Sequence, residues 1–389
     1  MTMLLPTHRS SIRAMPIALA AMALSACVST PGPQVAGSGT CKDASLGWAV
    51  GQPADEANLR RLSSESGAGL VNPIGPTTAV KHDTRSDRLR VYIDALPVAN
   101  NPTDTRMRRD HILTLSCPDT TGIVYRVTGL LYESGCNILD AQQFGDEESG
   151  RFFLRVHFDV PGATEIDVLQ EGFASLAEMF GMDWQIHDAS RKARLMVLVS
   201  KQGHCLNDLL FRVHSRQLPV EIACIASNHA DFAPLAQSYG VAFHHLPVSA
   251  GNRAEQERHI VDLVEREQID LVVLARYMQI LSPELCDALA GRAINIHHSF
   301  LPSFKGAKPY HQAHQRGVKI IGATAHYVTR DLDEGPIIEQ DVARVDHAMA
   351  PKELVRMGSD IESLVLARAV RRHVEHRILL NGHRTVVFR

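Results

Sequence analysis

The sequence predicts an α/β protein built from two successive units: a small α+β unit, then a larger unit with a mainly parallel β-sheet. A length of 389 residues suggests more than one domain. Residues 110–190 carry hydrophobic patterns in the order β-α-β-β-α-β. From residue 194 onward, short apolar strands alternate with amphipathic helices, which is typical of a parallel sheet covered on both faces.

Composition and charge exclude some kinds of partner. The formal net charge is −3 and the apolar share is 45%, as in ordinary globular proteins. Neither nucleic acid nor an anionic membrane is expected as a partner, because both would require a concentrated basic face. The seven cysteines form no CxxC or short Cys/His zinc spacing. We interpret most of them as reduced, buried thiols of a cytosolic protein.

The first 27 residues have the pattern of an export signal. Residues 8–27 have a basic start, a short apolar run and small residues before Cys27. The last four of them, Leu-Ser-Ala-Cys, resemble a lipoprotein processing box. The apolar run is short for a transmembrane helix. The alternative is an Ala-rich extension or a misassigned start.

Residues 28–107 are predicted to be a small extension with linkers. A stretch rich in Gly, Ser and Pro comes first, and residues 54–67 then favour a helix and residues 88–96 a strand. From Cys41 to the end of this strand, the chain resembles a small family of secreted bacterial peptidase inhibitors that also carry lipoprotein-type leaders.

Residues 108–192 are predicted to form the α+β unit. The expected strands are 111–117, 137–146, 151–160 and 183–189, and the expected helices are 123–135 and 164–181. This order is that of a ferredoxin-like unit. The segment 117–143 resembles the start of an ACT regulatory domain, where the turn after the first strand faces a small ligand or a dimer partner. A ferredoxin-like oligomerisation module without a ligand is the alternative.

Residues 193–389 are predicted to form a Rossmann-like unit. The expected strands are 194–200, 220–227, 241–248, 270–276 and 293–299, with helices such as 252–268 between them. Ligands of such sheets bind beyond the carboxyl ends of the strands. Arg276, Asn295 and His297 occupy such strand ends, so we expect the chemistry there.

Two polar segments stand out in this unit. Alternation along the strand 293–297 places Asn295 and His297 on one side, which costs free energy unless both are hydrogen-bonded. The segment 326–340 carries Asp333 before Glu-Gly-Pro, on a tight loop between two apolar runs. A carboxylate on such a loop is a typical partner for a histidine that orients substrate or transfers protons.

A metal site is not expected. His297 and His298 are predicted to point to opposite sides of their strand. His311 and His314 have helical i,i+3 spacing, but no HExxH or carboxylate-rich pattern accompanies them. We interpret these two as structural residues or as residues at the rim of a substrate site.

Three linked motifs in 194–389 resemble the folate-dependent formyltransferase family. They are the segments 275–283, 295–313 and 323–340. The resemblance implies that Asn295 and a protonated His297 stabilise the oxyanion formed on the formyl group. It also implies that Asp333 orients His297 and binds or deprotonates water. The folate-binding residues it implies are Tyr277, Met278, Gln279, Ile280, Leu281 and Val328.

The ACT-like unit upstream points to the deformylase branch of that family. The turn in 200–210 has one Gly where the transformylases have Gly-Asn-Gly-Ser, which puts a ribonucleotide phosphate site in doubt, and His298 stands where they usually have Pro. The resemblance implies hydrolysis of 10-formyltetrahydrofolate, with no cofactor, to formate for purine synthesis and tetrahydrofolate. The alternatives are transfer to an amine such as glycinamide ribonucleotide, an inactive ACT-type sensor, and peptidase inhibition by the extension.

The expected partners are the folate substrate, a small-metabolite effector at the ACT-like unit and further copies of the chain. The expected compartment is the cytoplasm, with no membrane contact for the catalytic part, because folate and purine metabolism take place there. The lipoprotein-like leader conflicts with this. We interpret the first hundred residues as a fused neighbouring reading frame or as a segment bypassed by an internal start, such as Met107.

Overall fold

The computed structural model describes residues 109–160, 166–302 and 309–389, together with a few residues before them (58, 61, 62, 64, 65, 70–74 and 88–92). The earlier residues form a separate unit, Met1–Asp104. In it, β1 (Leu70–Ile74) pairs in parallel with β2 (Arg88–Tyr92), within the predicted strand 88–96. The leader and most of the predicted inhibitor-like extension lie outside the described residues.

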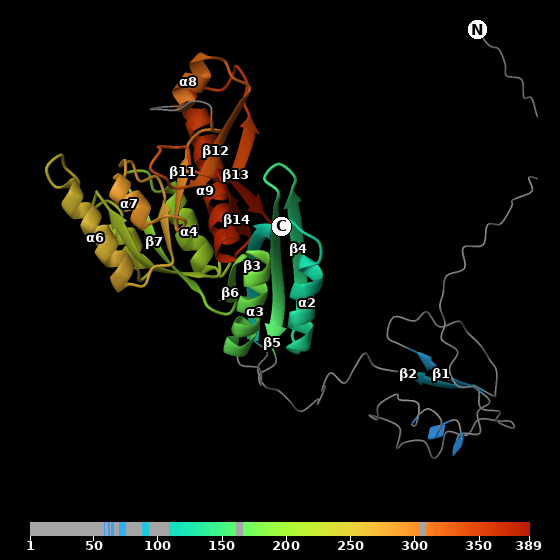
Figure 1. The fold of residues 1–389 in the computed structure, drawn as a ribbon. Coiled ribbons are helices and arrows are strands. Elements are labelled where there is room, and N and C mark those ends of the chain that lie inside the picture. Colours follow the sequence, from blue (N-terminus) through green and yellow to red (C-terminus); the bar gives the residue numbers. More distant parts are fainter. Residues whose placement is uncertain are drawn as a thin grey trace, which may run out of the picture. The chain divides into compact units, whose positions relative to one another are not determined.

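The α+β part has the predicted order of elements (Figure 1). They are β3 (Arg109–Pro118), α2 (Ile123–Glu133), β4 (Asn137–Asp146), β5 (Arg151–Val160), α3 (Ile166–Phe180) and β6 (Asp183–Asp188). The sheet order is β4-β5-β3-β6, antiparallel throughout. Helix α2 follows Gly122, whose φ of 96° suits glycine, and buries Ile123, Val127 and Leu131 at helical spacing.

The larger part contains a seven-stranded sheet in the order β13-β12-β11-β10-β7-β8-β9. Its strands are β7 (Ala193–Val199), β8 (Val220–Ser227), β9 (Ala242–His245), β10 (Leu271–Leu274), β11 (Ala293–His297), β12 (Ile320–Tyr327) and β13 (Ile337–Arg344). The strands from β11 to β9 pair in parallel, while β12 and β13 are antiparallel. The predicted α/β class and mainly parallel sheet are confirmed.

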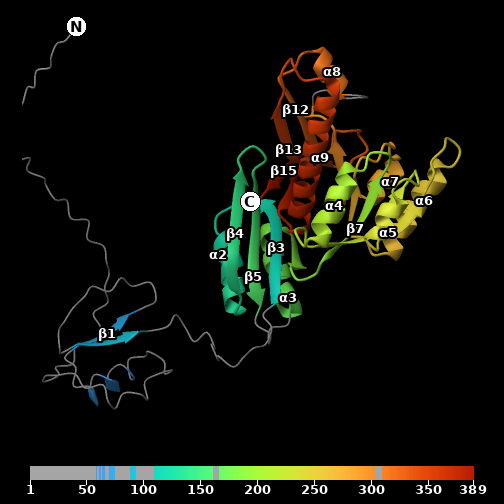
Figure 2. The same ribbon diagram turned by 180° about the vertical axis from the view of Figure 1, so that it is seen from behind.

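Helices cover both faces of this sheet, as Figure 2 also shows. The helices are α4 (His204–His214), α5 (Ala233–Ser238), α6 (Arg253–Arg266), α7 (Pro283–Ala288), α8 (Pro309–Gln315) and α9 (Pro351–Val374). One core contains residues of α4, α5 and α9, and the core on the other face contains residues of α6 and α7. The carboxyl edge of the sheet therefore lies between these two helical layers.

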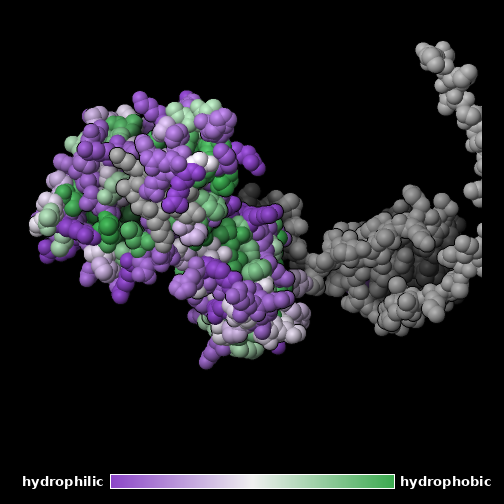
Figure 3. All heavy atoms as spheres, turned by 90° about the horizontal axis from the view of Figure 1, so that it is seen from above, coloured by the Kyte–Doolittle hydropathy of each residue, from purple (hydrophilic) through white to green (hydrophobic). Residues whose placement is uncertain are grey.

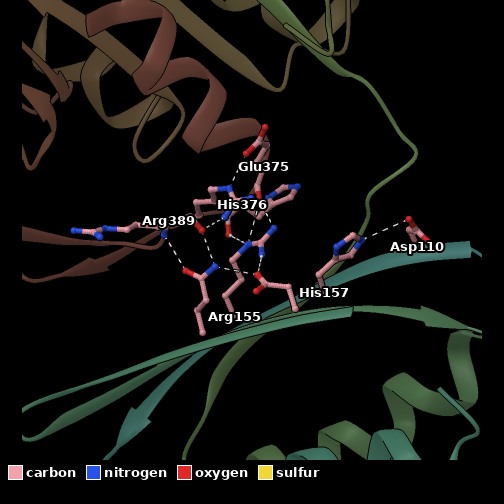
Figure 4. Close-up of polar contacts among 9 residues, drawn as sticks. Asp110, Arg155, His157, Glu375, His376 and Arg389 are labelled. Carbon is pink, nitrogen blue, oxygen red and sulfur yellow. Dashed lines mark hydrogen bonds and ion pairs between the residues drawn. The ribbon is translucent and has the colours of Figure 1, made fainter. Parts of the chain in front are cut away.

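The C-terminal residues join the two parts of 105–389. After α9, a hairpin of β14 (Ile378–Asn381) and β15 (Arg384–Val387) follows, which the sequence analysis did not foresee. The buried Arg155 of β5 donates hydrogen bonds to the carbonyls of Glu375 (3.0 Å) and His376 (3.2 Å), at the C-terminus of α9 (Figure 4). A guanidinium suits the negative end of a helix. His376 also stacks on His187 of β6 with ring centroids 3.6 Å apart.

The surface and the cysteines are those expected from the composition of an ordinary globular protein with reduced thiols. The face shown in Figure 3 is largely hydrophilic, with hydrophobic areas between the polar ones. No helix among the described residues is long and apolar enough to cross a bilayer. The five described cysteines are unpaired thiols, four of them buried and one half-buried: Cys117, Cys136, Cys205, Cys224 and Cys286.

Candidate active site

A cavity of about 750 Å³ lies at the carboxyl edge of the seven-stranded sheet. One group of its lining residues is largely apolar and comes from the side of α6 and α7: Met278, Ile280, Leu281, Cys286, Val328 and Leu332. A second group is polar and includes residues of α8 and α9: Gln202, Arg276, His298, Tyr310, Ser359 and Glu362. Asn295, His297, His326 and Asp333 line the same cavity.

The imidazole of His297 is held by Asp333. Its Nδ1 lies 3.1 Å from Oδ1 of Asp333, so the ring N–H at Nδ1 donates to the carboxylate. His297 ends β11 and is buried, and its Nε2 is buried without a hydrogen-bond partner among the described residues. This nitrogen is available to a substrate in the cavity, because the other ring nitrogen is already used.

Asp333 adopts an uncommon backbone conformation. Its φ of 59° lies in the left-handed region, in the loop between β12 and β13. Such a conformation costs about 1 kcal/mol or more in a non-glycine residue and is found preferentially at functional sites. Burial raises the pKa of Asp333, but the hydrogen bond from His297 and the nearby ring of His326, whose Nε2 lies 3.7 Å from Oδ1, outweigh burial and leave its pKa well below the usual range. The carboxyl group is therefore ionised at neutral pH.

His326 is a member of the cluster that the sequence analysis did not single out. It faces Asn295 across the β11–β12 ladder, and its Nδ1 lies 2.8 Å from the carbonyl oxygen of Tyr327. Since Nδ1–H donates to that carbonyl, Nε2 accepts from the Asn295 amide nitrogen at 3.3 Å. The contact orients the Asn295 carboxamide. Alternation in the apolar run before Asp333 could have identified His326, because a buried His in a strand needs a partner.

All six residues expected to bind folate line the cavity. Tyr277 and Leu281 are largely enclosed, while Met278 and Ile280 expose more than half of their surface. The chain here has neither helix nor strand, and the N–H of Met278 donates to Ser200 Oγ at 2.9 Å. An apolar slot bounded by main-chain polar groups suits a flat heteroaromatic ring.

The polar residues that line the cavity are arranged around Glu362, whose exposed fraction is 1%. This carboxylate accepts hydrogen bonds from His204 Nε2 (2.8 Å) and Tyr310 OH (2.7 Å), and Nε of Arg276 lies 3.3 Å away. Arg276 also donates two hydrogen bonds to Gln202 and has a φ of 64°. Burial raises the pKa of Glu362, but His204 and Arg276 outweigh it and lower that pKa. The sequence analysis identified only Arg276 of this cluster, because its members lie far apart in the chain.

The predicted orientation of His298 is wrong. His297 and His298 do not point to opposite sides: both line the cavity, with ring centroids 5.1 Å apart. The reason is that β11 ends at His297, so strand alternation does not extend to the next residue. Burial, together with the charge of Arg276, lowers the pKa of His298 to about 4, which keeps it neutral. The exposed His311 lies at the rim of the cavity, in agreement with its interpretation.

Within the described part of the chain, one group of side chains has donor atoms close enough together to hold a metal ion. Donor atoms of His204, Cys205 and Glu362 lie within 4.8 Å of one another. However, the Arg276 guanidinium pairs with this carboxylate, and a second cation would have to compete with it. Burial raises the pKa of the Cys205 thiol well above its usual range, which opposes the thiolate that a metal requires. These side chains fit a hydrogen-bonded network better than a metal centre.

Comparison with known proteins defines the class first. The formyl transferase family model matches residues 193–370, and the ACT domain model matches residues 111–167. The chain is thus a member of the formyl transferase family with an ACT domain before the catalytic part.

The relatives then specify the branch. The chain is 51% identical over 280 residues to a formyltetrahydrofolate deformylase of Corynebacterium sp., covering 72% of this chain and 98% of that protein. It is 48% identical to the Bacillus subtilis protein of that name, over 71% of this chain and 93% of the relative. The crystal structure of the formyltetrahydrofolate deformylase from Burkholderia mallei has a TM-score of 0.70 and 53% identity, covering 72% of this chain and all of that one. The chain belongs to the formyltetrahydrofolate deformylase family.

Proposed function

We propose that the chain hydrolyses 10-formyltetrahydrofolate to formate and tetrahydrofolate in the cavity at the carboxyl edge of the sheet. The single observation that carries this is the buried, unpartnered Nε2 of His297 in that cavity, with its other nitrogen fixed by Asp333. Such an atom can serve a reacting oxygen. The names of the relatives support the choice of substrate.

The formyl oxygen would lie between the Asn295 amide and Nε2 of His297. When the oxygen of water adds to the formyl carbon, negative charge develops on the formyl oxygen. The Asn295 amide, already oriented by His326, and a protonated His297 would then donate to that charge, each contributing about 3–4 kcal/mol. The pKa of Asp333 is lowered, so its carboxylate keeps its negative charge and holds the His297 ring through the hydrogen bond to Nδ1.

Collapse of the tetrahedral adduct completes the reaction. The bond between the formyl carbon and N10 breaks, and N10 takes a proton as tetrahydrofolate leaves. His297 would donate that proton. Of the two protons of the attacking water, one would return to His297 and the other would pass to solvent, so that formate leaves as an anion. Because the pKa of Asp333 is lowered, its carboxylate is a weak base. We therefore assign to Asp333 the positioning of His297 and of the attacking water.

The apolar part of the cavity would bind the pterin ring. The segment from Tyr277 to Leu281 would supply main-chain groups for the edge of the ring, and Val328, in the segment after β12, lines the same cavity. Release of formate from 10-formyltetrahydrofolate in the absence of any amine tests the proposal. Product formation that requires an added amine would instead establish a transferase.

We also propose that the ACT part mediates self-association. One face of the ACT sheet is contacted by the C-terminus of α9 and the final hairpin, so that face is not available to a second copy. What remains is the free edge strand β4, with Leu139 and Phe144 partly exposed, and the outer side of α2, with Tyr125 and Tyr132 exposed. A free, apolar edge favours pairing with a second copy. Analytical ultracentrifugation of the full chain, and of the chain from Thr105, would show a dimer or larger species. A monomer at all concentrations would refute this.

We further propose that the catalytic part works in the cytoplasm and that a small metabolite at the ACT part tunes it. The unpaired thiols of the described part support a reducing compartment. Cell fractionation with N-terminal sequencing of the active enzyme tests the location. A lipid-modified Cys27 on the active chain would contradict it.

A further inference from the structure

The charged side chains at the polar end of the cavity are paired with one another. In this they differ from the side chains of a site that binds a charged ligand. Glu362 is almost completely buried and has three donors around it, from the start of α4, from the segment after β10 and from α8. Its partner Arg276 is itself buried and is held a second time by Gln202. A buried carboxylate with three donors has little remaining capacity to accept from a substrate amine.

The charge of this end is balanced as well. The pKa of Glu362 is lowered and that of His298 is lowered to about 4, so Glu362 is ionised and His298 is neutral. The guanidinium of Arg276 is therefore paired with a carboxylate rather than available to an anionic acceptor. A phosphorylated amine would have to break this pair, at the free-energy cost of leaving a buried charge alone.

Side chains of the protein itself pack against the N-terminus of α4. A Cβ atom on Gly203 would lie 2.3 Å from the ring of Phe232, and the side chain of the next residue, His204, turns to Glu362. The start of α4 is thus bounded by the ring of Phe232 at Gly203 and by the network at His204.

We propose that the network of His204, Arg276, Tyr310 and Glu362 determines the acceptor of the reaction: it fills the end of the cavity opposite the folate slot, so that water reaches the formyl carbon and an amine does not. The inference rests on the proposed hydrolysis and adds the reason why it is hydrolysis. These four residues are specificity-determining residues, and the chemistry remains with Asn295, His297 and Asp333. Water needs only a small space near the formyl carbon, whereas an amine acceptor needs room for its substituent.

The test measures how the formyl group is divided between water and an added amine. Parent and variant enzymes would turn over 10-formyltetrahydrofolate with either hydroxylamine, a small neutral amine, or phosphoethanolamine, a phosphorylated one. The ratio of formylated amine to formate is the readout. This ratio does not depend on the amount of folded enzyme, so a loss of stability alone does not change it.

Two variants loosen the network to different degrees. Tyr310→Phe removes one donor with little change in volume, and Glu362→Gln retains the shape but frees Arg276 from its counter-charge. We expect the ratio for phosphoethanolamine to rise about 10-fold or more in Glu362→Gln. Loss of an interaction that excludes the amine by about 1.4 kcal/mol gives a factor of 10. A smaller rise is expected in Tyr310→Phe. Arg368→Ala, an exposed position on the same helix paired with Asp341, is the matched control and should equal the parent.

The outcomes separate this inference from the proposed function. If the parent releases no formate without an amine, the proposed hydrolysis is wrong. If the parent releases formate, and both folded variants keep the parental ratio with both amines, the network does not determine the acceptor and the inference is overturned. A raised ratio with either amine in Glu362→Gln supports it.

Discussion

Two carboxylates line the same cavity, the half-buried Asp333 and the buried Glu362, and only one of them is placed to take part in the reaction. Asp333 and Glu362 both have lowered pKa values and both pair with basic side chains. The partner of Asp333, His297, keeps one ring nitrogen without a hydrogen bond. The partners of Glu362 instead converge on the carboxylate, and Arg276 is also tied to Gln202. The unsatisfied atom, more than the charge, indicates where the chemistry occurs.

The backbone elements that carry the two carboxylates also differ. Asp333 sits on a loop in a left-handed conformation, and its side chain is 14% exposed. Glu362 lies within the 24-residue helix α9, and its side chain is 2% exposed. A helix holds its side chains rigidly, whereas a strained loop residue persists only when its surroundings fix it. We conclude that Asp333 presents its charge to a ligand, whereas Glu362 organises the protein around it.

The largest effect is expected from Asp333→Asn. The change removes the negative charge that orients His297 but keeps the size of the side chain. We expect kcat for formate release to fall about 10²–10⁴-fold, while folate binding persists. Steady-state kinetics with a folate-binding titration would check this. Near-normal turnover would remove Asp333 from the mechanism.

A smaller loss is expected from Asn295→Ala, which removes one donor to the developing oxyanion. We expect kcat to fall about 10²–10³-fold, with little change in KM, because the hydrogen bond strengthens mainly in the transition state. A rise in KM at unchanged kcat would show that Asn295 binds the ground state only. The half-buried Asn252→Ala variant, at the start of α6, is the matched control.

His326→Gln should have a more modest effect, since His326 acts through Asn295 and Asp333. We expect about a 10-fold loss of kcat, in the range of partners that orient other functional side chains. In the double variant with Asn295→Ala, the two losses should not add, because one residue positions the other. Additive losses in a double-mutant cycle would contradict this positioning role.

The smallest effect concerns pH and stability at His298, the neighbour of both clusters. Its folded pKa, about 4, lies below the ordinary value of 6.5, because of burial and the charge of Arg276. The stability that neutral His298 contributes is therefore complete above about pH 6.5 and is lost as the pH falls toward 4. The slope is at most about 1.4 kcal/mol per pH unit. In thermal unfolding at pH 7 and pH 5, His298→Gln should lose less stability than the parent. An equal loss would show that other groups dominate, with the exposed His314→Gln as the control.

Much of the fold and the reacting residues could be predicted from the sequence. Alternation in β11 placed Asn295 and His297 together, and the turn residues after Asp333 marked its loop. Periodicity gave the β-α-β-β-α-β order of the ACT part. These are local signals, carried by residues that are neighbours in the chain.

The rest depends on contacts between distant residues. Glu362 meets His204 from 158 positions away, and Arg155 meets Glu375 from 220 positions away, so no local pattern could reveal either pair. The position of His298 depended on where β11 ends, and strand ends are the least predictable part of an element. The His326–Asn295 contact was only partly predictable. Both strands could be expected from the sequence, but the register of β11 against β12 could not.

The most direct test of the central claim is hydrolysis in water labelled with ¹⁸O, without any amine. If water attacks the formyl carbon, each formate released from 10-formyltetrahydrofolate contains one oxygen atom from the solvent and one from the formyl group. We predict formate and tetrahydrofolate in equal amounts, with one ¹⁸O atom per formate by mass spectrometry and about 10²–10⁴-fold slower release by Asp333→Asn. Absence of formate from the parent enzyme, or formate without solvent oxygen, would contradict the account.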